Sequence, residues 1–148
     1  QAGLSWLTIL KRREGYRRLY DGFDARLVAG YNEMRIGKML TDSGIIRNRK
    51  KIESSVNNAQ RFLKICEAYG SFCNYLWGFV AGKQVVNHFE VPSQIPATTP
   101  LSDTISKDLK QKGFKFLGST IIYAHLQATG LVNDHLISCF RHSPCTVT

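Results

Sequence analysis

Apolar residues recur at helical spacing along most of this chain and predict short helices nearly throughout. The longest such stretch is Arg47–Tyr69, where apolar positions return every three or four residues until Gly70 ends the pattern. Shorter helices are expected at Ser5–Arg13, Asp24–Ala29, Asn32–Leu40, Ser71–Phe79 and Ser119–Thr129, with another that is capped by Ser102 or Asp103 and closed by Gly113. The fold class predicted is therefore all-α, a compact bundle of short helices.

The segment 82–100 interrupts this helical pattern. It holds three of the four prolines, and polar residues separate them, which is typical of a loop that runs over the surface. Strand signals are weak except at Gln84–Phe89. The loop is too short to separate two domains, and 148 residues suffice for one core. We therefore expect a single domain over residues 1–148.

Basic residues outnumber acidic ones by 20 to 11, which gives a formal charge of +9. They gather at 11–18, 47–51 and 107–115, beside predicted turns and helix ends. This favours a polyanionic partner, with nucleic acid ahead of simple solvation. A membrane surface is the weaker alternative, because no helix splits into an apolar and a basic face. No apolar run is long enough to span a bilayer.

The four cysteines are too few for a small disulfide scaffold. Cys66 lies within a strongly helical stretch, where a cysteine is typically a small buried apolar residue. We therefore expect an intracellular, reducing compartment, and a monomer is the default expectation.

The stretch Gly113–Cys139 predicts two helices joined by a tight turn, which is an αα-hairpin. Gly118 precedes Ser119 and Thr120, so the second helix opens with small polar residues. Its unpaired N–H groups are able to bind a DNA phosphate, and Lys115 in the turn adds positive charge. The alternative is an ordinary helix connection.

A candidate metal site follows the second helix. His135 and Cys139 are four residues apart, which places both on one face if the segment is helical and suits a tetrahedral Zn²⁺. His142 and Cys145 extend the series, so a self-contained site is an alternative. Two ligands alone do not make a structural zinc site.

The chain opens with the hexapeptide QAGLSW. A glycine beside an apolar residue, here Gly3 and Leu4, is able to form a turn that enters a base stack. Trp6 is able to stack on a base that has been flipped out of the duplex. The alternative is that Leu4 and Trp6 are core residues.

Three motifs occur in order: QAGLSW, DSGIIRNRKKI and KDLKQKGFKFLGSTIIYAHLQATGLVNDH. Together they closely resemble the 3-methyladenine DNA glycosylase I (Tag) family of helix–hairpin–helix DNA glycosylases, from Gln1 to about Cys139. The resemblance implies a monofunctional hydrolase of base excision repair. Such an enzyme cleaves the N-glycosidic bond of 3-methyladenine in double-stranded alkylated DNA and releases the free base.

The resemblance also implies roles for individual residues. Trp6 matches the tryptophan that stacks on the damaged base, and Leu4 with Gly3 matches the loop that enters the DNA. Asn133 occupies the position at which more active helix–hairpin–helix glycosylases carry a catalytic aspartate. His135 and Cys139 match two of the four ligands of a zinc ion.

The resemblance leaves part of the family pattern unmatched. The family's other two zinc ligands, a base-reading glutamate, a pocket tyrosine and a second tryptophan precede the QAGLSW motif. We therefore expect a domain that is incomplete at its N-terminus relative to the family. This expectation supports an alternative function, a helix–hairpin–helix DNA-binding module whose catalysis is lost or impaired.

Overall fold

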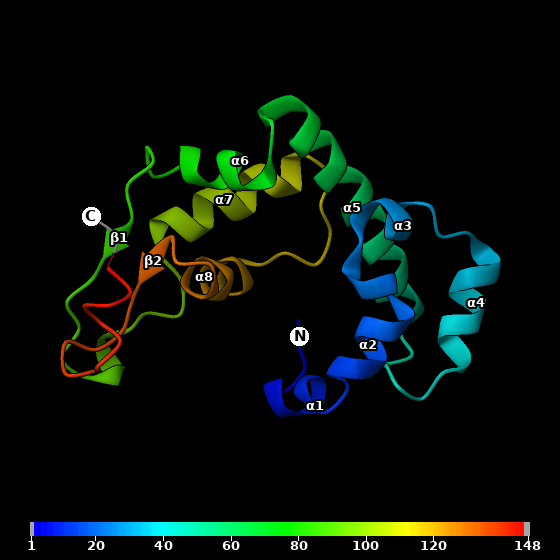
Figure 1. The fold of residues 1–148 in the computed structure, drawn as a ribbon, viewed down its shortest axis with the longest axis horizontal. Coiled ribbons are helices and arrows are strands. Elements are labelled where there is room, and N and C mark those ends of the chain that lie inside the picture. Colours follow the sequence, from blue (N-terminus) through cyan, green and yellow to red (C-terminus); the bar gives the residue numbers. More distant parts are fainter. Residues whose placement is uncertain (1, 147–148) are drawn as a thin grey trace. The chain divides into compact units, whose positions relative to one another are not determined.

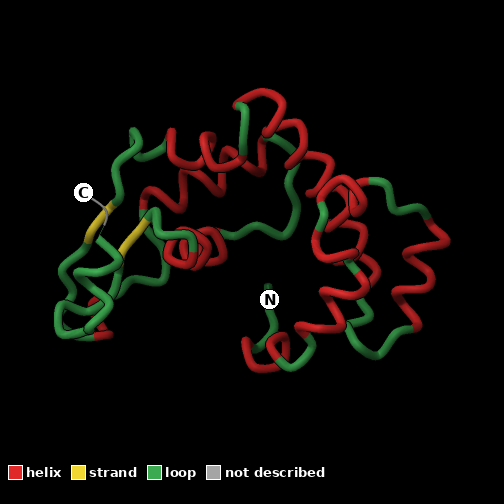
Figure 2. Tube along the Cα trace, viewed as in Figure 1, coloured by secondary structure: helices red, strands yellow, loops and turns green. Residues whose placement is uncertain are grey.

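The computed structural model describes residues 2–146, and helices dominate this part of the chain (Figures 1 and 2). The only strands among these residues are two short segments, β1 and β2, and the expectation of an all-α fold is confirmed. The chain forms two compact units. The first runs to Ala68 and includes Lys112–Phe116; the second comprises Tyr69–Gln111 and the chain from Leu117 onward. The single domain expected over 1–148 stays a prediction.

The helices of the first unit follow the capping residues of the sequence. They are α1 (Trp6–Leu10), α2 (Arg13–Leu19), the 3₁₀ turn η1 (Asp21–Phe23), α3 (Ala25–Ala29), α4 (Glu33–Thr41) and α5 (Arg49–Tyr69). The side chains of Ser5, Asp24 and Asn32 accept hydrogen bonds from backbone N–H groups in the first turns of α1, α3 and α4. α2 was not predicted, because its basic residues obscure the apolar spacing.

The core of the first unit is built by apolar residues of α2 to α5 and of the connection between α4 and α5. Its members include Leu19, Val28, Ile36, Met39, Ile45, Ile52 and Val56. One close approach depends on a glycine: a Cβ atom at Gly15 of α2 would lie 2.1 Å from the carbonyl oxygen of Gly44. The turn at Asp42-Ser43-Gly44 therefore packs directly against the α2 backbone.

The second unit contains α6 (Phe72–Gly78), β1 (Val85–Val86), the 3₁₀ turn η2 (Pro92–Gln94), α7 (Pro100–Gln111), α8 (Ser119–Ala128) and β2 (Val132–Asn133). α8 packs beside α7 (Figure 1), with Ile105, Leu109 and Leu126 buried. β1 and β2 pair in parallel, with Val85 opposite Val132. This pairing places the chain after α8 against the loop that precedes α7.

The start of α7 differs from the prediction. Pro100 occupies the first turn, where its missing N–H is not needed, and the hydroxyl of Thr99 accepts from the N–H of Ser102. Ser102 is therefore a fully buried residue inside the helix and not its cap, and Asp103 lies in its first turn.

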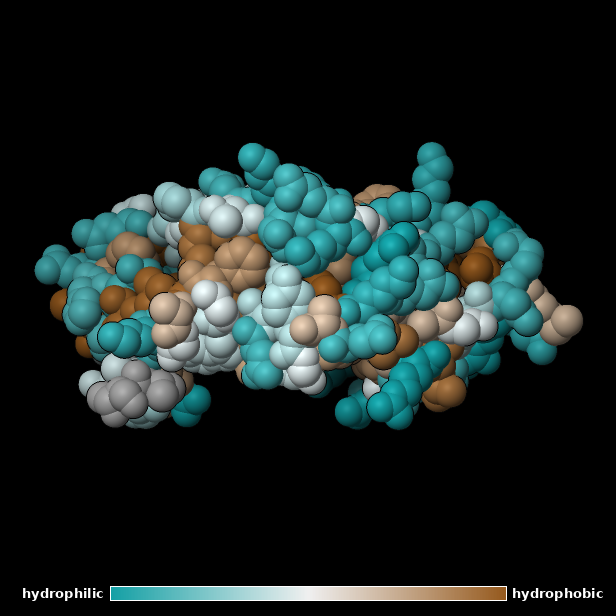
Figure 3. Space-filling model, turned by 90° about the horizontal axis from the view of Figure 1, so that it is seen from above, coloured by the Kyte–Doolittle hydropathy of each residue, from teal (hydrophilic) through white to brown (hydrophobic). Residues whose placement is uncertain are grey.

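The face of the molecule in Figure 3 carries mainly hydrophilic side chains, with apolar groups in smaller patches. Among residues 2–146, none of the helices combines the length and the apolar character that crossing a bilayer requires.

Candidate active site and DNA interface

The amino-terminal turn holds three of the candidate residues. Gly3 is exposed and adopts a φ of +69°, a left-handed conformation that favours glycine, and Leu4 is partly buried. Ser5 then caps α1. The ammonium group of Lys51 in α5 donates a hydrogen bond to the carbonyl oxygen of Ala2. The DSGIIRNRKKI motif, to which Lys51 belongs, therefore fixes the QAGLSW turn within the first unit.

Trp6 begins α1, and its side chain is 62% exposed. α1 has no buried residue, and Leu7 and Leu10 are exposed as well. The alternative that Trp6 is a core residue is therefore excluded. An exposed indole on a short helix is available to stack on a planar ligand.

The first turn of α8 carries the other candidate residues of the hairpin. Gly118 is the N-cap and has no side chain with which to bond the first N–H groups. Its carbonyl oxygen accepts from the N–H groups of Ile121 and Ile122. Ser119 is partly buried and shares a 2.7 Å hydrogen bond with Ser102 of α7, while Thr120 is exposed. This bond fixes the start of α8 against α7.

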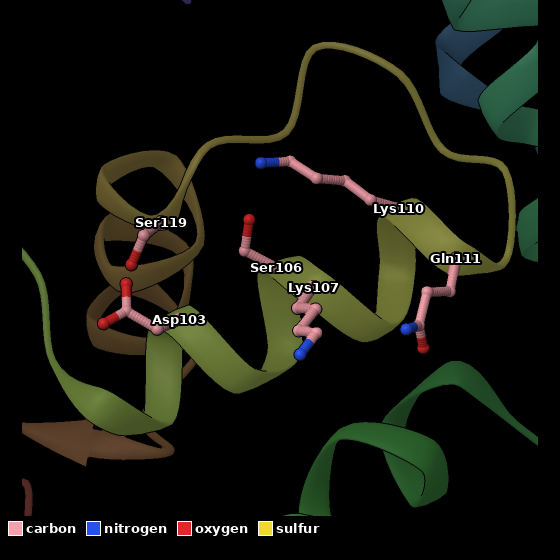
Figure 4. Close-up of a pocket in the computed structure, with 6 residues that line it drawn as sticks. All are labelled: Asp103, Ser106, Lys107, Lys110, Gln111 and Ser119. Atoms are coloured by element: carbon pink, nitrogen blue, oxygen red, sulfur yellow. The ribbon is translucent and has the colours of Figure 1, made fainter.

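A pocket of about 430 Å³ lies at this junction (Figure 4). Five residues of α7 and one of α8 line it: Asp103, Ser106, Lys107, Lys110, Gln111 and Ser119. In Figure 4 the side chain of Lys110 extends toward the start of α8, on the same side of α7 as Ser106. The hydroxyl of Ser106 donates to the carbonyl oxygen of Leu117 at 3.1 Å. A cationic group thus lies beside a helix N-terminus, an arrangement that suits an anion.

Lys115, the remaining candidate residue of the predicted hairpin, belongs to the first unit. Its backbone is fixed by Asn58 of α5, which accepts from the Lys115 N–H at 2.8 Å and donates to its carbonyl oxygen at 2.9 Å. The Lys115 side chain is exposed. The neighbouring Asn57 donates to the carbonyl oxygen of Gly113 at 2.9 Å.

Asn133 is buried in β2, and its amide is engaged on both sides. Its Nδ2 donates to the carbonyl oxygen of His142 at 2.9 Å and to the hydroxyl of Thr146 at 3.1 Å. Its Oδ1 accepts from the His135 N–H at 3.2 Å. The geometry gives Asn133 a structural task, holding two turns together, and its catalytic role stays a prediction.

Asp134, which the sequence did not single out, is the centre of a buried network. Its carboxylate accepts from the Tyr123 hydroxyl, from Gln127 at 2.7 Å and from Asn87 at 2.7 Å. Burial and the hydrogen bond to Asp134 raise the pKa of Tyr123, so this phenol stays a donor. The network joins β2 to α8 and to the residue that follows β1. The buried carboxylate had no local signal beyond its place in the segment VNDH.

His135 and Cys139 lie close together, although the segment is not helical, which was the condition under which their spacing places them on one face. The segment forms turns, because the Ile137 N–H donates to the carbonyl oxygen of Phe89 and the Cys139 N–H donates to that of Leu136. Nδ1 of His135 nevertheless lies 3.7 Å from Sγ of Cys139. Zn–S and Zn–N bonds of about 2.3 and 2.1 Å at a tetrahedral angle separate the ligand atoms by about 3.6 Å. The pair therefore fits one edge of a zinc tetrahedron.

His142 and Cys145 do not complete this pair. Nε2 of His142 donates to the carbonyl oxygen of Asn87 at 3.0 Å. Within residues 2–146, no group of three or more His, Cys, Asp or Glu side chains is arranged to hold a metal. The self-contained four-ligand alternative is therefore not formed in this part of the chain. All four cysteines are free thiols.

Comparison with known proteins gives the family of the chain. The sequence model of the methyladenine glycosylase family matches residues 1–142, and the chain belongs to this family. DNA-3-methyladenine glycosylase 1 of Escherichia coli is 44% identical over 139 residues, which cover 94% of this chain and 74% of that protein. The DNA-3-methyladenine glycosylase of Haemophilus influenzae is 41% identical over 145 residues, covering 98% and 76%.

Solved structures give the same result. The crystal structure of a 3-methyladenine DNA glycosylase I (TAG) variant in complex with 3-methyladenine is 42% identical, with a TM-score of 0.91. The match covers 96% of this chain and 76% of that one. A crystal structure of 3-methyladenine DNA glycosylase I (TAG) is 44% identical, with a TM-score of 0.89, and the match covers 96% and 78%.

Proposed function

We propose that this chain is a monofunctional DNA glycosylase of base excision repair. It hydrolyses the N-glycosidic bond of 3-methyladenine in double-stranded alkylated DNA and releases the free base. The observation that carries the proposal is the exposed indole of Trp6 beside the glycine turn. Membership in the methyladenine glycosylase family supports it. Because DNA is the substrate, we propose that the protein acts inside the cell.

The chemistry requires little covalent help from the protein. Methylation at N3 leaves the purine cationic, so the base is already a good leaving group. The main tasks are to extrude it from the stack, to recognise it and to admit water. An aromatic face opposite a cationic base contributes about 1–2 kcal/mol when both are desolvated. Trp6 supplies this face, and Leu4 with Gly3 fills the space that the base leaves in the duplex.

The experiment for this proposal is the release of base from methylated duplex DNA, followed by chromatography of the soluble products. Free 3-methyladenine above the uncatalysed background is the expected result. The alternative, a DNA-binding module without catalysis, is favoured by the engagement of the whole Asn133 amide in hydrogen bonds. Salt-sensitive binding of the duplex without base release would establish that alternative.

The pocket at the start of α8 is proposed as a phosphate site of the helix–hairpin–helix motif, with Lys110 as its cation. Each lost phosphate contact lowers the slope of log Kobs against log[salt] by about 0.9. We expect Lys110→Ala to lower the slope by about this amount and to weaken binding equally across sequences. Fluorescence anisotropy at several salt concentrations measures this slope. Lys38→Ala, an exposed lysine in the last turn of α4, is the matched control and keeps the slope of the parent protein. An equal decrease of the slope in both variants would show that Lys110 is not part of a phosphate site.

Zinc is the proposed metal of the His135–Cys139 pair, because the distance between their ligand atoms fits a tetrahedral site. Among residues 2–146, this pair supplies two of the four positions of such a site. A bound zinc ion supplies a structural crosslink, and the pair holds the metal through one imidazole nitrogen and one thiolate.

Replacement of Cys139 by serine is expected to abolish metal–thiolate bonding in this chain. Titration of the protein with Co²⁺ reports a thiolate ligand by its charge-transfer absorbance in the near ultraviolet. We expect the band in the parent protein, its loss in Cys139→Ser, and its retention in Cys73→Ser, which removes an exposed cysteine elsewhere. Loss of the band in Cys73→Ser but not in Cys139→Ser would refute the assignment.

A further inference from the structure

Phe116 combines a half-exposed apolar side chain with a left-handed backbone conformation. Its side chain is 49% exposed, and its φ of +58° lies in the left-handed region that a bulky residue rarely adopts. It immediately follows Lys115 in the connection between α7 and α8. A glycine at this position would give the same backbone without steric cost. The ring therefore stands where neither packing nor backbone geometry favours it, and strain of this kind is concentrated at functional sites.

The backbone just before Phe116 is held rigidly. Asn58 pairs with both the N–H and the carbonyl oxygen of Lys115, and Asn57 bonds the carbonyl oxygen of Gly113. Gly113 itself has a φ of +88°, and a Cβ atom there would lie 3.0 Å from Nε of Arg61. Two successive amides of α5 thus fix two residues of the connection, Gly113 and Lys115, through three hydrogen bonds. Phe114 is buried, whereas the exposed residues at the end of this segment are Lys115 and Phe116.

The charge of this segment indicates what the ring meets. Lys115, whose side chain is exposed, directly precedes Phe116 in the same unit, and the chain carries a formal charge of +9. An exposed aromatic ring next to a lysine suits a duplex, because the ammonium group meets a phosphate while the ring contacts sugars and base edges. An apolar protein partner would not require the cation.

We propose that Phe116 is an apolar DNA contact that packs into the minor groove of the substrate duplex, and that Asn58 is the residue that positions it. This inference rests on the proposed DNA glycosylase function. It also explains the strained backbone. Because the connection already has its bound conformation before DNA binds, binding carries no entropic cost for ordering this loop.

Three variants at position 116 separate the ring from the backbone. Phe116→Gly removes the ring and also relieves the steric strain of the left-handed backbone. Phe116→Ala removes the ring but keeps the strain, and Phe116→Trp keeps an aromatic ring. We expect Phe116→Gly and Phe116→Ala to weaken binding of a methylated duplex about tenfold, in line with the loss of one aromatic contact to a base. Phe116→Trp binds within about threefold of the parent protein by the same scale.

Stability gives the discriminating measurement. Phe116→Gly is expected to unfold at a temperature equal to or above that of the parent protein, although it binds DNA more weakly. A ring that merely packs would give the opposite relation, a lower unfolding temperature with unchanged affinity. That result overturns the proposal.

The role of Asn58 is tested by a double-mutant cycle. If Asn58 acts on DNA through Phe116, Asn58→Ala weakens binding in the parent protein but not further in the Phe116→Ala background. Full additivity of the two losses in affinity refutes the positioning role. The parent protein must bind the duplex and release 3-methyladenine in the same assays. Absence of both activities refutes the glycosylase proposal itself, whereas normal activity with unchanged affinity in Phe116→Gly refutes only this inference.

Discussion

Replacement of Trp6 by alanine is expected to lower kcat/KM for release of 3-methyladenine by about 10- to 100-fold. Stacking on a base contributes about 1–3 kcal/mol, and each 1.4 kcal/mol corresponds to a factor of ten. The loss is expected mainly in the reaction and not in the fold, because Trp6 is 62% exposed and α1 has no buried residue. Base release from methylated duplex measures the first effect, and thermal unfolding measures the second.

Leu7→Ala is the matched control for Trp6. Leu7 is the next residue of α1, is 54% exposed and has no aromatic face. We expect this variant to retain kcat/KM within about threefold, because most exposed substitutions shift free energies by about 0.5 kcal/mol or less. Trp6→Phe should lie between the two, since the smaller ring still stacks but binds a cation less strongly. If Leu7→Ala lowered kcat/KM as much as Trp6→Ala does, the effect would come from α1 as a whole and not from stacking by the indole.

Replacement of Asp134 by alanine is expected to give the largest loss of stability, about 3 kcal/mol or more in the free energy of unfolding. Hydrogen bonds to a charged group contribute about 1.5–3 kcal/mol each, and the change leaves one buried and two partly buried donors without their acceptor. These donors belong to Tyr123, Gln127 and Asn87. The midpoint of unfolding in urea, compared at equal slope, measures the loss.

Glu90→Ala is the control for Asp134. Glu90 is an exposed residue of the loop that follows β1, and its backbone N–H is the group that bonds Gln94. Its loss of stability is expected to stay within about 0.5 kcal/mol. A similar loss in both variants would show that the carboxylate of Asp134 contributes nothing beyond a generic charge.

Local signals in the sequence predicted the helices well, and long-range bonds account for what it did not predict. Ser5, Asp24 and Asn32 bond N–H groups within three residues, so their roles as caps follow from short motifs. The segment from His135 to Cys139 forms turns that no local signal predicts, because the Ile137 N–H donates to the carbonyl oxygen of Phe89, 48 positions away. No spacing rule contains that partner.

The candidate site shows the same division. The motif at Gly3, Leu4 and Trp6 was recognisable because it is contiguous; Trp6 is exposed, and its base-binding role stays a prediction. The contacts of Asp134 and Asn58 depend on distant partners. Asp134 bonds Tyr123, 11 positions away, and Asn58 bonds Lys115, 57 positions away. Neither a buried carboxylate nor an asparagine that bonds a distant backbone can be recognised from a single sequence.

The parallel pairing of β1 with β2 has a consequence for the order of folding. The two strands are separated by more than forty residues that include α7 and α8, so closing this segment carries a large entropic cost for only two paired positions. We therefore expect the strands to join after the two helices have docked, when the separation has already been reduced. On this order the carboxy-terminal turns, with the free thiols of Cys139 and Cys145, assemble last, and their thiols stay accessible to oxidants until that step.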